Sequence, residues 1–116
     1  MPASISIASI PDDRLDDWRA FQAELAGPRR IEWVQSQRRR GIRREVIWLD
    51  ADGPTAYYLQ EAADPDAAQE LDADDPFDAW YAARLDELHP DGMRRPATVF
   101  DSSPAPGAWR GLPRGW

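Results

Sequence analysis

Two short runs near the middle of the chain, separated by turn-forming residues, constrain the fold more than any other feature. The runs are Glu-Val-Ile-Trp-Leu at 45–49 and Ala-Tyr-Tyr-Leu at 56–59, and Asp-Ala-Asp-Gly-Pro at 50–54 separates them. β-Branched and aromatic residues that flank Asp, Gly and Pro are typical of antiparallel strands joined by a turn. The sequence therefore predicts a β-hairpin whose alternate side chains lie on opposite faces.

The segments on either side of this hairpin complete a symmetrical order of elements. A helical pattern precedes it, with a break predicted at Gly27-Pro28 because proline cannot donate to the preceding turn. A second helical pattern follows it, and short extended runs at 4–10 and 97–100 lie outside the two helical regions. The order β-α-β-β-α-β predicts an α+β, ferredoxin-like domain over residues 1–101 with a four-stranded antiparallel sheet. Helices then cover one face of the sheet, and the other face needs a partner.

The second helical region carries two start signals. Asp64-Pro65 and Asp75-Pro76 each place an aspartate at the N-cap and a proline at the first helical position. We therefore predict a helix from Asp64, a break, and a new helix from Asp75 that ends at His89. The acidic residues around Asp75 lack the spacing of a calcium-binding loop, so a helix cap is predicted there rather than a metal site.

Composition excludes several classes of protein. A chain of 116 residues with 42% hydrophobic residues is expected to fold around one modest core. The net charge of −7 argues against nucleic acid as a partner. The absence of lysine and cysteine removes Schiff-base chemistry and thiolate metal sites, and we predict no cofactor. The sequence has no apolar run of membrane-spanning length and no basic N-terminal signal, so we expect a cytoplasmic protein without a membrane partner.

The candidate groups for proton transfer are few. Glu45 and Glu61 lie on the predicted hairpin, where a buried glutamate would have a raised pKa and could act as a base. Tyr58 is a further candidate on the same hairpin. His89 is the only histidine, although its position at a helix end also suits a protonated side chain that compensates the helix dipole. For both glutamates, an ion pair with arginine at an interface is the alternative.

The candidate groups for ligand binding are mainly aromatic. Trp48 and Tyr57 lie on the hairpin, and Trp80 and Tyr81 on the second helix, where they could line a small-molecule site or simply fill a core. Arg44 belongs to the one basic run of the chain, at 38–44. A solvated helix end is the simplest explanation of that run, and the alternatives are an arginine aimed at an anionic substrate or a salt bridge across a dimer.

From Gly41 onward the sequence resembles the dimeric α/β-barrel superfamily, which includes antibiotic-biosynthesis-type monooxygenases. The resemblance is carried by Gly41 with Glu45 four residues later, by the Tyr-Tyr-Leu strand that ends at Glu61, and by Asp-Pro-Phe at 75–77 before an aromatic helix. It covers about half of the chain. The chain differs from well-characterised members by lacking a histidine between 75 and 80.

Two segments are similar to a narrower group. Residues 39–49 and 76–80 resemble a DUF6176-like family of short bacterial proteins of unknown function. The superfamily resemblance implies a homodimer in which two sheets pack face to face around a cavity of small-molecule size. It does not imply a particular reaction.

These observations lead to a function and an alternative. We expect a small-molecule-binding dimeric α/β-barrel protein, with a cofactor-independent oxygenase, cyclase or isomerase of secondary metabolism as the class of enzyme. The alternative is a non-catalytic interaction or regulatory module that only dimerises through its sheet. The Pro/Gly-rich tail at 102–116, with Trp109, Leu112 and Trp116, is predicted to pack across the barrel or the dimer partner.

Overall fold

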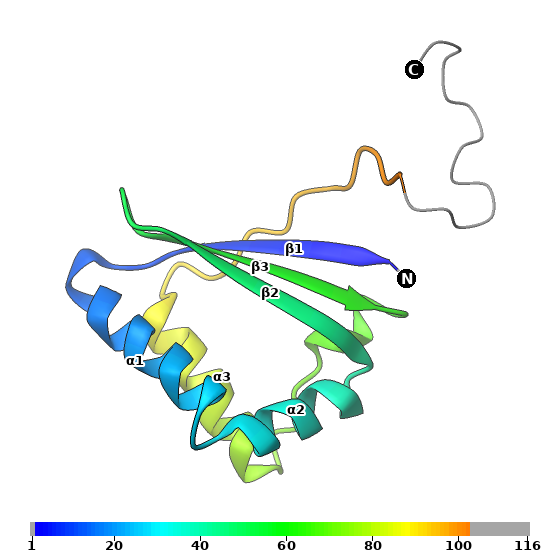
Figure 1. Cartoon of the computed structure of the whole chain (residues 1–116), viewed down its shortest axis with the longest axis horizontal. Coiled ribbons are helices and arrows are strands. Elements are labelled where there is room, and N and C mark those ends of the chain that lie inside the picture. The colour runs from blue at the N-terminus through cyan, green and yellow to red at the C-terminus, as the bar shows by residue number, and fades with distance from the viewer. Residues whose placement is uncertain (1, 103–116) are drawn as a thin grey trace.

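The computed structural model, which describes residues 2–102, contains an antiparallel sheet with all its helices on one face (Figure 1). The strands, in sheet order, are β1 (Ala3–Ser9), β3 (Thr55–Ala62) and β2 (Ile42–Asp50). The helices are α1 (Leu15–Ala26), α2 (Arg30–Arg39) and α3 (Pro76–Leu88), with short 3-10 turns η1 (Asp12–Arg14) and η2 (Ala67–Gln69). None of the helices within residues 2–102 is long and apolar enough to cross a bilayer.

The sheet has three strands, so the prediction of a fourth strand at 97–100 was wrong. After α3 the chain does reach the free edge of β1, where Arg94 and Ile7 exchange two backbone hydrogen bonds of 2.8 and 2.7 Å. In an antiparallel ladder the next hydrogen-bonded pair would join Pro96 to Ile5. Because Pro96 has no backbone N–H, that pair cannot form and the ladder stops after one bridge.

The predicted helix break is confirmed. α1 ends at Ala26 and α2 begins at Arg30, so Gly27-Pro28 lies in the short connection between them. α2 then ends before Gly41, whose φ of +76° is a left-handed conformation that favours glycine.

The helix predicted from Asp64 was wrong, because only the 3-10 turn η2 forms there. The Asp64 carboxylate accepts hydrogen bonds from the backbone N–H groups of Asp66 and Ala67, at 3.1 and 3.2 Å, and so caps this turn. Glu70 already has an extended backbone, with φ −81° and ψ +102°. The nine residues between the two start signals, 66–74, therefore hold the 3-10 turn η2 and no helix of greater length.

The second start signal is confirmed as a helix cap. Asp75 accepts a hydrogen bond of 3.0 Å from the backbone N–H of Asp78, and Pro76 occupies the first helical position. Asp78 itself is fully buried and accepts bonds from Ser36 at 2.6 Å and from Arg39 at 3.1 Å. These contacts connect the N-terminus of α3 to α2.

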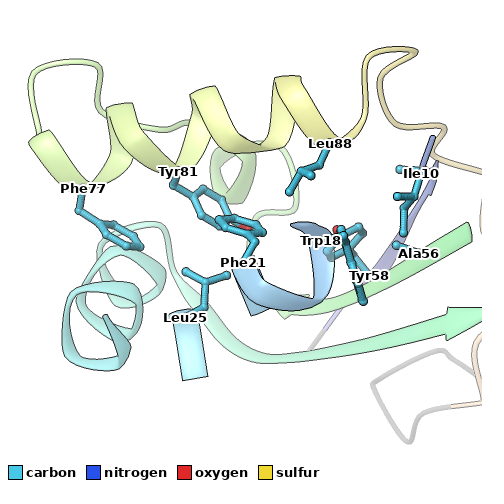
Figure 2. Packing of buried hydrophobic residues seen from close by; sticks show 10 residues of the cluster. Ile10, Trp18, Phe21, Leu25, Ala56, Tyr58, Phe77, Tyr81 and Leu88 are labelled. Carbon is cyan, nitrogen blue, oxygen red and sulfur yellow. The ribbon is translucent and has the colours of Figure 1, made fainter. Parts of the chain in front are cut away.

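The hydrophobic core lies between the helices and the inner face of the sheet (Figure 2). Small residues of β1 and β3, such as Ala8 and Ala56, let the helices approach closely, and aromatic side chains from the helices fill the space. The buried core residues are Ala8, Ile10, Trp18, Phe21, Leu25, Ala56, Tyr58, Phe77, Tyr81 and Leu88.

The outer face of the sheet carries no helix (Figure 1). Strand alternation and register place Ile5 and Ile7 of β1, Tyr57 of β3 and Trp48 of β2 on this face. The Trp48 side chain is 48% exposed. We call this surface the helix-free face.

The strand β2 forms one edge of the sheet and pairs only with β3 among the described residues. Its register is interrupted between Ile42 and Arg44. The opposite edge of the sheet is β1, whose outer side carries a single bridge, to Arg94, among the described residues.

Candidate functional site

A small, partly enclosed cavity of about 80 Å³ lies between the inner face of the sheet and the helices. The wall is formed by side chains of all three strands, of η2 and of α3, together with three residues from the connections between elements. Most of the lining residues carry hydrogen-bonding side chains. The lining residues are Ser6, Arg40, Glu45, Tyr58, Gln60, Gln69, Leu71, Tyr81, Leu85 and Met93.

Glu45 is the carboxyl group of this cavity. Strand alternation puts it on the inner face with Ile47, directly opposite Gln60 of β3. One carboxylate oxygen, Oε2, accepts hydrogen bonds of 3.0 Å from the side-chain amides of Gln60 and Gln37. Burial raises the pKa of Glu45, while these two amides and the nearby Arg40 guanidinium oppose the increase. A carboxylate with a raised pKa is a stronger base than an ordinary glutamate, which suits it to general-base chemistry.

A chain of amides fixes the orientation of the Glu45 carboxylate. Gln69 of η2 donates a 2.6 Å hydrogen bond to Oε1 of Gln60. Since the carbonyl end of the Gln60 amide is held in this way, its NH₂ end is directed at Glu45.

Arg40 contributes the positive charge of the cavity. It follows α2 immediately, and only 9% of it is exposed. Its Nε donates to the carbonyl of Ser36 at 3.3 Å, and Nη1 donates to the carbonyl of Ala68 at 2.9 Å. The third nitrogen, Nη2, is buried and has no hydrogen-bond partner within residues 2–102. The guanidinium carbon lies 5.8 Å from the ring centroid of Tyr81.

The hydroxyl of Tyr58 belongs to a buried hydrogen-bond network. His89 Nδ1 lies 2.9 Å from the carbonyl oxygen of Ser9, which can only accept, so Nδ1 carries the proton. In a neutral ring Nε2 is then an acceptor, and the Tyr58 hydroxyl donates to it at 2.7 Å. The same hydroxyl accepts a 2.9 Å bond from the indole N–H of Trp18. Figure 2 shows Trp18 beside Tyr58 in the core.

This network keeps both titratable groups neutral. Burial lowers the pKa of His89, which is 3% exposed. The protonated state that a helix-dipole role requires is therefore disfavoured. Burial also raises the pKa of the Tyr58 hydroxyl, and its one proton is committed to His89. Tyr58 is therefore poorly placed to donate a proton to a ligand.

The other predicted residues of the hairpin lie away from the cavity. Glu61, Trp48, Tyr57 and Arg44 are on the helix-free face because they have the opposite strand parity to Glu45 and Tyr58. There Arg44 and Glu61 form a largely exposed ion pair of 3.2 Å. The structure thus brings Glu45, Tyr58 and Tyr81 together and separates Glu61 and its neighbours from them.

Trp80 is also outside the cavity. Its ring centroid lies 5.5 Å from that of Phe21 and 5.6 Å from that of Phe77, and the Arg29 guanidinium carbon is 4.0 Å from its centroid. Trp80 therefore packs against the core between α1 and α3, whereas its neighbour Tyr81 lines the cavity.

Sequence reasoning missed Arg40, Gln60 and Gln69 as cavity residues. Gln60 could have been found, since it shares the strand parity of Tyr58. Arg40 gave no such signal, because it lies within a basic run that is typical of a solvated helix end. Within residues 2–102, no group of three or more histidine or acidic side chains is arranged to hold a metal ion.

Comparison with solved structures shows what fold this geometry belongs to. The L-rhamnose mutarotase FA22100 from Formosa agariphila superposes with a TM-score of 0.65 at 12% identity, covering 89% of this chain and 100% of that one. Rv0793 from Mycobacterium tuberculosis superposes with a TM-score of 0.57 at 19% identity, covering 87% and 97%. No protein-family model and no curated protein sequence matches the chain. At these identities the likeness shows a shared α+β, ferredoxin-like fold.

Proposed function

We propose that this protein is an isomerase-type enzyme that acts on a small, hydroxyl-rich molecule bound in the cavity between the sheet and the helices. The observation that carries the proposal is the carboxyl group of Glu45, which lines the cavity and is held in a fixed orientation by two amides. The fold likeness to a sugar mutarotase supports the same class of chemistry. An oxygenase or cyclase of the antibiotic-biosynthesis type is the alternative chemistry, and we prefer an isomerase because seven of the ten lining residues, Glu45 among them, carry hydrogen-bonding side chains.

The residues of the cavity suit proton transfer within a bound ligand. Glu45 would accept a proton from one atom of the ligand and return it to another, which leaves the composition of the ligand unchanged. Tyr81, from the helix layer, remains protonated because burial raises its pKa, so its hydroxyl can donate a hydrogen bond to a ligand oxygen. Tyr58 lines the cavity, but its hydroxyl proton is bound to His89 and is not available to the ligand.

Exchange NMR of anomers tests this proposal. The wild-type protein should accelerate the interconversion of the α and β anomers of at least one sugar in a panel that includes L-rhamnose and common hexoses and uronates. Glu45→Gln keeps the size of the side chain and should lower the rate about 10²-fold or more. Glu61→Gln is the matched control, since it lies on the helix-free face and should retain activity. No acceleration for any sugar, or equal rates in both variants, would refute the proposal.

The helix-free face supports a second proposal, that the protein is a homodimer with its two sheets face to face. Trp48 is half exposed there, and Phe100 lies with Ile5 and Leu59 around a shallow depression on the same side. A module whose only role is to dimerise through this face is the non-catalytic alternative. It would leave the oriented, partly buried carboxyl of Glu45 without a function.

A further inference from the structure

We infer that the ligand of the cavity carries a carboxylate, which Arg40 binds. This inference rests on the proposed function and adds a substrate class to it: a small hydroxy acid rather than a neutral polyol or sugar. Its starting point is a buried cation that the described part of the chain leaves without an anionic partner.

The guanidinium of Arg40 is held by neutral groups and forms no ion pair within residues 2–102. Two of its nitrogens donate to the backbone carbonyls of Ser36 and Ala68, which fixes the plane of the group. Neither carbonyl carries a formal charge, and no acidic side chain within residues 2–102 forms an ion pair with Arg40. Arginine is almost never fully buried unless it is paired, and a buried donor without a partner costs about 1–3 kcal/mol. An acceptor that reaches Nη2 would remove this cost.

Glu45 does not fill this role, although it lines the same cavity. Its Oε2 is occupied by the amides of Gln37 and Gln60, which hold the carboxylate away from ion-pair distance to Arg40. The two side chains therefore offer one cavity both a fixed cation and a carboxyl group with a raised pKa. A ligand that spans the space would place its carboxylate at Arg40 and a hydroxyl group at Glu45.

The size of the cavity limits the part of the ligand that enters it. A volume of about 80 Å³ corresponds to roughly two or three water molecules at about 30 Å³ each. A short hydroxy acid, or the acidic end of a longer one such as a uronate, has this size. Planar carboxylates are also the groups that a guanidinium binds with two parallel hydrogen bonds, so a small shift of Arg40 toward the ligand would satisfy Nη2.

Matched pairs of probes test the inference directly. Glycerate and glycerol differ in the carboxylate, and so do galacturonate and galactose. Binding to the wild-type protein is measured by calorimetry and by the NMR signal of the Arg40 Nε–H group, assigned with Arg40→Lys. We expect each acid to bind at least tenfold more tightly than its neutral partner and to shift the Arg40 signal. Arg40→Gln should abolish the difference, and Arg38→Gln, in the exposed part of α2, should not change it.

If Arg40→Gln does not fold, the NMR titration of the wild-type protein still shows whether the acids bind at Arg40. Equal binding of acids and neutral partners, or failure of either acid to bind and shift the Arg40 signal, would overturn the inference. If the neutral sugars are isomerised and Glu45→Gln removes that activity, the proposed function stands while the carboxylate specificity fails. If no sugar or acid is isomerised but the acids bind at Arg40, the carboxylate site stands and the proposed function fails.

Discussion

At the scale of single residues, the burial of His89 predicts a lowered imidazole pKa, which one NMR signal can test. Burial holds its pKa below the ordinary value of about 6.5, whereas the unfolded chain keeps that value. Between the folded pKa and about 6.5 the unfolded state binds more protons, so the free energy of unfolding should decrease as the pH falls through this window. Because the chain has one histidine, its imidazole C2–H resonance should titrate with a midpoint below 6.5.

A variant separates this effect from the titration of carboxylates. Between pH 7.5 and pH 5.5, about one unit either side of the reference value, the free energy of unfolding of the wild-type protein should decrease more than that of His89→Gln, measured by urea denaturation. Equal pH dependence in the two proteins, or a midpoint above the reference value, would show that His89 is not held neutral by burial.

Strand parity explains which site residues the sequence could predict. Alternation along β3 separates Tyr58 from Tyr57 and Glu61, but it could not say which set meets the helices or on which side Glu45 of β2 lies. That choice depends on packing, since small residues such as Ala56 leave room for helices on one side only. The commitment of the Tyr58 hydroxyl to His89 joins residues 31 positions apart, so no local pattern indicates it.

At the scale of elements, the N-cap of α3 is expected to contribute measurably to stability. Asp75→Ala removes the acceptor for the Asp78 backbone N–H and should lower the free energy of unfolding by about 0.5–2 kcal/mol. Asp75→Asn, which can still cap, should lose less. Asp74→Ala is the control, since Asp74 is exposed and lies just before the cap. Equal losses for Asp74→Ala and Asp75→Ala in urea denaturation would contradict this role.

The elements that the sequence predicted correctly are those with local signals at both ends. Gly27-Pro28, Gly41 and Asp75-Pro76 act through the backbone within a few residues, so α1, α2 and α3 could be placed without tertiary information. The fourth strand failed because its pairing depends on the register with β1. Only that register reveals that Pro96 falls where a backbone donor is required.

At the scale of the whole molecule, the helix-free face predicts the state of assembly. Light scattering should show a dimer at concentrations on the order of tens of micromolar, where interfaces of standard size remain formed. Trp48→Glu, which places a charge among the apolar residues of this face, should yield a monomer. Ile31→Glu is the matched control, because Ile31 is 74% exposed on α2 and should leave the dimer intact. A monomeric wild-type protein would refute face-to-face dimerisation.

The domain boundary and the packing of the tail stay predictions at this scale. The predicted tail at 102–116 lies outside the described residues apart from Ser102. The common α+β fold of the chain and its structural neighbours followed from the order of elements alone, since that order allows few topologies.

The edge strand β2 has a consequence for behaviour in concentrated solution. A nine-residue strand with one unpaired row of N–H and C=O groups is a template on which other chains can add strands and begin a fibril. The interruption of its register between Ile42 and Arg44 twists the beginning of this edge, and the exposed charge of Arg43 disfavours an apolar strand laid alongside. The same few residues that begin the strand therefore also protect the native protein against edge-to-edge aggregation.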